Sequence, residues 1–179
     1  MKILFLEDTK NARFAISNYN NEEFEISFAG DLISFHGALC EEEGYNEYGC
    51  IVLDLQIEMF MFSEEVIASC IEEFKDKKIP SLVPGQNMPL YGLDYYKEVI
   101  YTRPETKKMV DEGRVILITG HEYLLRRLGL YNENLPLFEK TKLIARGGPG
   151  ENERLFGYFR GVKNNWPKAG GTSDVRENK

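Results

Sequence analysis

The sequence predicts one α/β domain with a mainly parallel sheet, and two patterns support this fold class. Short apolar runs alternate along the chain with helical patterns, as in folds built from successive strand and helix units. Several runs, such as residues 50–53 and 115–118, have no polar interruption, which is typical of strands buried on both faces of a parallel sheet. The 179 residues are enough for one domain with its own core.

Five strands are predicted from the apolar patterning. Most are short continuous runs, whereas Phe24, Ile26 and Phe28 alternate with polar residues and indicate a half-buried strand. In chain order the predicted strands are residues 2–6, 24–28, 50–53, 115–118 and 135–138.

Helices are predicted between the strands. The first has apolar side chains at i, i+3, i+4 and i+7, and Thr9 is positioned to cap its start. Pro104 is expected to interrupt a longer helix, because a proline disfavours helical geometry in the residue before it. The predicted helices are residues 12–19, 32–43, 90–110, 123–128 and 151–163.

Polar side chains follow the predicted strands at the point where each strand ends. Glu7 and Asp8 follow the first strand, Asp54 the third, Thr119 the fourth and Lys140 the fifth. The carboxyl ends of parallel strands lie at one edge of a sheet, which is where such sheets bind ligands. We therefore expect these five side chains to gather at that edge.

The residue types at this edge suit phosphoryl transfer. Carboxylates brought together repel one another unless a cation lies among them, and a few oxygen ligands are what Mg²⁺ prefers. A carboxylate is also a nucleophile that forms an acyl phosphate. Lys140 and Thr119 would supply the cation and the hydroxyl that stabilise phosphoryl oxygens.

Five short motifs at these positions together resemble the receiver domain of two-component response regulators. They are KILFLED, IVLDLQ, MPLYGLDYYKEV, VILITG and LPLFEK, in the order that the family uses. The resemblance spans about residues 1–165. It implies a three-layer, flavodoxin-like fold with a doubly wound parallel sheet of five strands in the order 2-1-3-4-5.

The resemblance also implies a role for each residue at the edge. Asp54 corresponds to the phosphoacceptor, Thr119 to the switch hydroxyl and Lys140 to the lysine that contacts the phosphoryl group. The implied Mg²⁺ ligands are Glu7, Asp8, Asp54 and the backbone carbonyl of Gln56.

One departure from the family pattern is an insertion of about residues 57–87. Pro89, in the Met-Pro motif that usually follows the phosphoacceptor closely, stands 35 positions after Asp54. The insertion includes an expected helix that starts near Ser63, and it begins directly beside the predicted site.

Other departures lie around Lys140. Thr141 stands where the family usually has a proline, and Leu137 stands at the position of the switch aromatic residue. Phe138, one residue later, is expected to point to the opposite face, because strand side chains alternate. A competing register takes Arg146 as the cation at the strand end, and it leaves Lys140 unexplained.

The overall composition argues against several classes of function. With 29 acidic and 22 basic residues the formal charge is −7, which disfavours nucleic-acid binding. The cysteines form no CxxC pair, and His36 and His121 are not spaced as ligands, so no zinc site is expected. We expect His36 on a helix surface. With no signal segment and no membrane span, the protein is predicted to be cytoplasmic.

The function predicted from the sequence is a stand-alone receiver, not an enzyme. It would accept a phosphoryl group on Asp54 from a histidine kinase or phosphotransfer protein. Residues 166–179 follow the last predicted helix and are predicted to be a disordered tail. Since only this tail follows, the output is expected to pass through a partner protein. One alternative is a pseudo-receiver that is never phosphorylated and serves as a protein-interaction module. Another is a phosphohydrolase with Asp54 as nucleophile, which Gln56 disfavours because such phosphatases carry a second acid there.

Overall fold

The computed structural model describes residues 1–18, 22–40, 44–57, 91–120, 136–144 and 149–165. Within these ranges five strands form one sheet, in which every neighbouring pair is parallel and the order is β2-β1-β3-β4-β5. The strands are β1 (Lys2–Leu6), β2 (Glu25–Ala29), β3 (Tyr48–Asp54), β4 (Val115–Thr119) and β5 (Leu137–Glu139). This topology confirms the predicted flavodoxin-like, doubly wound α/β fold.

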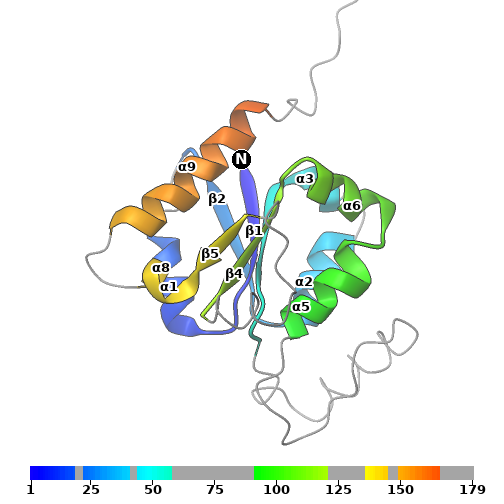
Figure 1. Cartoon of the computed structure of the whole chain (residues 1–179), viewed down its shortest axis with the longest axis horizontal. Helices are drawn as coiled ribbons and strands as arrows, with labels where there is room; N and C mark the ends of the chain where they lie inside the picture. The colour runs from blue at the N-terminus through cyan, green and yellow to red at the C-terminus, as the bar shows by residue number, and fades with distance from the viewer. Residues whose placement is uncertain (19–21, 41–43, 58–90, 121–135, 145–148, 166–179) are drawn as a thin grey trace, which may run out of the picture.

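Helices cover both faces of the sheet and complete a three-layer architecture (Figure 1). One face is covered by α1 (Lys10–Ser17), α8 (Lys140–Ile144) and α9 (Pro149–Asn165). The other face is covered by α2 (Leu32–Cys40), α3 (Gly44–Glu47), α5 (Tyr91–Tyr95) and α6 (Pro104–Asp111), with the π-helix η3 (Tyr96–Ile100) directly after α5.

The core has two halves, one on each face of the sheet, because side chains along a strand alternate in direction. On β3, Ile51 and Leu53 pack with the α2 and α5 side chains, whereas Cys50 and Val52 pack with those of α1 and α9. All four are fully buried, and each buried aliphatic side chain contributes about 2 kcal/mol. This burial on both faces explains why the central strands have no polar interruption.

The long helix predicted at 90–110 is interrupted, as expected, before Pro104. Arg103 has extended backbone angles (φ −80°, ψ 133°), which the following proline favours, and Pro104 begins α6. Just before the break, the Tyr101 N–H donates to the Tyr96 carbonyl at 2.8 Å, so the helix widens to a π-turn there. The sequence pattern did not predict this widening.

Several element boundaries differ from the predicted ones. The strand β5 begins at Leu137, two residues later than predicted, and α9 begins at Pro149 rather than at Glu151. The helices α3 and α8 were not predicted. Some predictions concern parts of the chain outside the described residues and are therefore not tested by the structure. They are those for residues 58–87 of the proposed insertion, the helix at 123–128, Arg146, His121 and the tail at 166–179.

The prediction that His36 lies on a helix surface is wrong. His36 is buried on α2, and its Nδ1 lies 2.9 Å from the hydroxyl of Tyr95 on α5. The reason is the helical period: Leu32, Phe35, His36 and Leu39 share one face at i, i+3, i+4 and i+7, and that face packs on the sheet.

Arg114, just before β4, ties together the opposite edge of the sheet, where the strands begin. Its Nε donates to the Gly49 carbonyl at 3.0 Å, and its Nη2 donates to the carbonyls of Tyr45 and Tyr48 at 3.0 and 2.7 Å. Its Nη1 pairs with Glu112 at 2.9 Å. Beside Arg114 lies a hollow along α9, lined by Tyr158, Val162, Asn165 and two glycines.

In the part of the chain that the structure describes, no helix is both long enough and apolar enough to span a membrane.

Candidate functional site

Strand register brings the acidic residues to the same level at the carboxyl edge of the sheet. Leu6 on β1 pairs with Leu53 on β3, so Glu7 and Asp54 are the next residues on two neighbouring strands. Asp54 pairs in turn with Ile118 on β4. The sheet thus places side chains that are 47 positions apart in the sequence next to one another.

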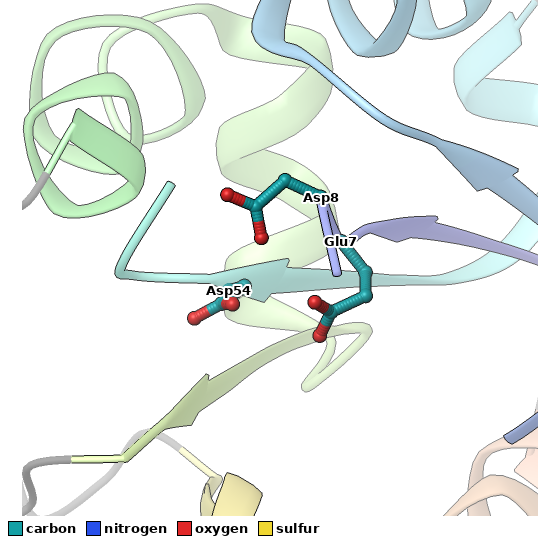
Figure 2. Close-up of side chains that lie close together, drawn as sticks. All are labelled: Glu7, Asp8 and Asp54. Atoms are coloured by element: carbon teal, nitrogen blue, oxygen red, sulfur yellow. The ribbon is translucent and has the colours of Figure 1, made fainter. Parts of the chain in front are cut away.

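Three carboxylates form what we call the acid cluster: Glu7, Asp8 and Asp54. Each contributes an oxygen within 4.8 Å of the others, and Figure 2 shows the three carboxylate groups gathered at the ends of β1 and β3. Glu7 and Asp54 are completely buried, and Asp8 is only 9% exposed. Burial removes the water that would otherwise screen their repulsion, so ionisation of all three carboxylates requires nearby cations.

Lys140 supplies one such cation. It is the first residue of α8, immediately after β5, and its ammonium hydrogen-bonds to Asp54 Oδ2 and, at 2.8 Å, to Glu7 Oε1. The same nitrogen lies 4.0 Å from Asp8 Oδ1. The side chain is 14% exposed, so these charge pairs are largely shielded from solvent. Four of the predicted site residues therefore meet at one point.

With all three carboxylates ionised, the acid cluster carries more negative charge than Lys140 neutralises. Burial raises the pKa of Asp54 to about 7; the Lys140 ammonium opposes this rise, while the Glu7 carboxylate adds to it. Burial also depresses the pKa of Lys140, but the carboxylates of Asp54 and Glu7 outweigh that effect and raise the pKa overall. Lys140 therefore stays protonated, and a second cation would relieve the remaining repulsion.

The two oxygens of Glu7 have unequal surroundings. Oε1 accepts hydrogen bonds from the Thr9 N–H at 2.9 Å, from the Thr9 hydroxyl, and from Lys140. Oε2 is buried and has no hydrogen-bond partner among the described residues. A buried carboxylate oxygen without a donor fits a position that faces a metal ion, and an all-carboxylate set of ligands suits Mg²⁺. Glu7, Asp8 and Asp54 are thus the residues that could hold it.

Two other predicted residues border the cluster. The Gln56 N–H donates to Asp54 Oδ1 at 3.0 Å and helps to orient that carboxylate. Thr119 is fully buried at the end of β4, one residue beyond the register partner of Asp54. The metal-binding role of the Gln56 carbonyl and the switch role of the Thr119 hydroxyl remain predictions.

Gly92 on α5 lies directly against the backbone of Asp54. A Cβ atom at this glycine would come within 1.9 Å of the Asp54 carbonyl oxygen, far closer than any side chain tolerates. The start of α5 can approach the end of β3 only because residue 92 has no side chain. Gly92 thus allows α5 to pack directly against the backbone at the end of β3.

Thr9 has a role that the sequence did not reveal. It occupies the N-cap position of α1, as predicted, but its hydroxyl makes no capping hydrogen bond and is directed to Glu7 instead. The sequence pattern that could indicate this bond is a threonine two residues after an acid, since short polar side chains often hydrogen-bond to near neighbours. That signal does not distinguish the two partners.

Fold and site together define a flavodoxin-like α/β domain with a buried acid cluster at the carboxyl edge of its sheet. No family model matches the sequence, and no curated protein matches it significantly. Among solved structures, that of the bacteriophytochrome response regulator AtBRR matches over 93% of this chain and 94% of its own, with 14% identity and a TM-score of 0.49. At that distance the likeness carries no argument about function, which rests on the site itself.

Proposed function

We propose that this chain is a phosphoacceptor domain of the receiver type, in which Asp54 takes the phosphoryl group in the presence of Mg²⁺. The observation that carries the proposal is the ammonium of Lys140, which bridges Asp54 and Glu7 inside a buried acid cluster. Phosphoryl transfer depends mainly on positioning and charge neutralisation, and this arrangement offers both around a carboxylate nucleophile.

The transfer would proceed at the Asp54 carboxylate. One of its oxygens attacks the phosphorus of a phosphohistidine, in line with the bond to the imidazole nitrogen. The new O–P bond forms as the N–P bond breaks, and the imidazole leaves with that electron pair and takes up a proton from solvent. The product is an aspartyl phosphate, which water later hydrolyses to phosphate and the free carboxylate.

The residues around Asp54 have distinct tasks in this proposal. Lys140 already contacts the carboxylate and would shift its ammonium to the incoming phosphoryl oxygens. The Gln56 N–H holds the second Asp54 oxygen and so fixes the direction of attack. Glu7, Asp8 and Asp54 would hold Mg²⁺, which would supply positive charge against the carboxylates and the phosphoryl group.

The proposed phosphodonor is a histidine kinase or a phosphotransfer protein, and the output is an altered affinity for a downstream protein. Phosphorylation would act by changing the balance between two conformations of the domain. In this proposal the protein is a signalling domain and turns over no substrate apart from its own aspartyl phosphate.

The test is to incubate the protein with MgCl₂ and acetyl phosphate and to measure intact mass. We expect the addition of one phosphoryl group that is labile in alkali and absent from Asp54→Asn. Asp111→Asn, which changes an exposed aspartate paired with Lys107, is the matched control and should be modified like the wild type.

Three results would contradict the proposal. If the wild-type protein gains no phosphoryl group and does not bind Mg²⁺, the result would indicate a protein-interaction module that is not phosphorylated. An adduct that persists in Asp54→Asn would move the acceptor to another residue. Multiple turnover of phosphate esters would indicate a phosphohydrolase.

A further inference from the structure

We infer that Thr9 is a positioning residue that makes Glu7 a one-oxygen ligand and thereby favours Mg²⁺ over the larger Ca²⁺. The inference rests on the proposed Mg²⁺-dependent function and concerns how the same site selects its ion. It assigns a role to a residue outside the set predicted from the sequence motifs.

The hydrogen bonds around Glu7 carry the inference. Thr9 donates twice to Oε1, from its N–H at 2.9 Å and from its hydroxyl, and Lys140 donates a third time at 2.8 Å. Three donors use the lone pairs of Oε1 and fix the plane of the carboxylate. Oε2 is then the oxygen of Glu7 that remains for an ion.

The second observation is that the Thr9 hydroxyl gives up a favourable alternative. Thr9 has the extended backbone of an N-cap (φ −81°, ψ 124°), and a capping hydroxyl normally bonds to an N–H in the first turn of the helix. No such bond forms here. A capping hydrogen bond from the Thr9 hydroxyl would stabilise α1. Because the hydroxyl bonds to Glu7 instead, its orientation stabilises the acid cluster rather than the helix.

The chemistry of the two ions gives the direction of the selectivity. Ca²⁺ takes six to eight oxygen ligands and often uses both oxygens of one carboxylate, whereas Mg²⁺ accepts fewer protein ligands in stricter geometry. A Glu7 carboxylate held by one oxygen cannot rotate to offer both. Thr9 would therefore weaken Ca²⁺ binding and preorganise Glu7 for Mg²⁺.

The experiment compares Mg²⁺ and Ca²⁺ titrations of wild type, Thr9→Val and Thr9→Ser by isothermal titration calorimetry. Valine keeps the shape and the N–H of residue 9 but removes the hydroxyl. We expect Thr9→Val to lose about tenfold in Mg²⁺ affinity, as is usual when a residue that orients a ligand is changed. Its Ca²⁺ affinity should fall less or rise, and Thr9→Ser should keep the wild-type preference.

Controls separate this inference from the function on which it rests. Ser17→Ala removes a hydroxyl that bonds to the Phe14 carbonyl at the other end of α1, and it should leave both affinities unchanged. If the wild type binds Mg²⁺ but Thr9→Val keeps the same ratio of affinities, or loses both equally, the role of Thr9 is overturned while the phosphoacceptor proposal stands. If the wild type does not bind Mg²⁺, the proposed function and this inference both fail.

Discussion

Buried charges occur at both edges of the central sheet, and the two groups are built on opposite principles. At the edge where strands begin, Arg114 donates to three carbonyls and pairs with Glu112, so its charge and its donors are matched. At the edge where strands end, the three carboxylates of the acid cluster face the ammonium of Lys140, and Glu7 Oε2 has no donor among the residues that the structure describes. A buried charge whose hydrogen bonds and countercharge are all supplied by the protein indicates a structural role. A buried group of charges that the protein does not fully satisfy indicates a binding site.

The largest expected change in stability comes from replacing Arg114, the buried charge at the edge where strands begin. Arg114→Met would leave the carbonyls of Gly49, Tyr45 and Tyr48 without that donor, so we expect the free energy of unfolding to fall by about 4 kcal/mol. Urea denaturation measures this change. Arg160→Met, at an exposed pair with Glu23, should change it by less than about 1 kcal/mol. Equal losses in both variants would remove the distinction between the groups.

Two glycines near the opposite edges should respond to alanine in opposite ways. Gly92→Ala forces a methyl group against the Asp54 carbonyl, and we expect a loss of about 3 kcal/mol because the backbone must move. Gly157 on α9 faces open space, so Gly157→Ala should stabilise the protein by about 1 kcal/mol through its helix propensity. Thermal unfolding of both variants tests this, and a stable Gly92→Ala protein would contradict the close packing.

The acid cluster should cost stability when no metal is bound. A carboxyl whose pKa is about 7 in the folded protein and near 3.8 in the unfolded chain binds more protons when folded between those values. The contribution of Asp54 therefore becomes increasingly unfavourable as pH rises from about 4 to about 7. In EDTA at pH 8, Asp54→Asn should be at least about 2 kcal/mol more stable than wild type, because it removes a carboxylate whose pKa is raised by burial and whose ionisation at that pH opposes folding.

This gain should shrink as pH falls and vanish below about pH 3, where Asp54 is protonated in both the folded and the unfolded state. Urea denaturation of both proteins across this pH range is the measurement. A gain in stability that is independent of pH would show that the pKa of Asp54 is not raised in the folded protein. Asp111→Asn, at an exposed site, provides the matched comparison.

The sequence was sufficient for the parts of the molecule that depend on repeated patterns. The strands β1, β3 and β4 were predictable because burial on both faces demands continuous apolar runs such as residues 50–53. The meeting of Glu7, Asp54 and Lys140 followed from the rule that parallel strands end at one edge.

What the sequence did not reveal depends on single side chains and their choice of partner. The hydroxyl of Thr9 could bond to the first turn of α1 or to Glu7, and both lie equally near along the chain. The sequence analysis expected His36 on a helix surface, although its spacing from Leu32 and Leu39 places it on the buried face of α2. The π-turn after Tyr96 likewise depends on tertiary packing rather than on local pattern.

The contact between His36 and Tyr95 has a practical consequence for following the protein in solution. The imidazole on α2 touches the hydroxyl of a residue on α5, three positions beyond the glycine that abuts the Asp54 carbonyl. The chain contains two histidines, so the His121→Gln variant would leave one imidazole signal in a nuclear magnetic resonance spectrum. That signal is an unlabelled reporter, already built into the core, of whether events at Asp54 move the neighbouring helix.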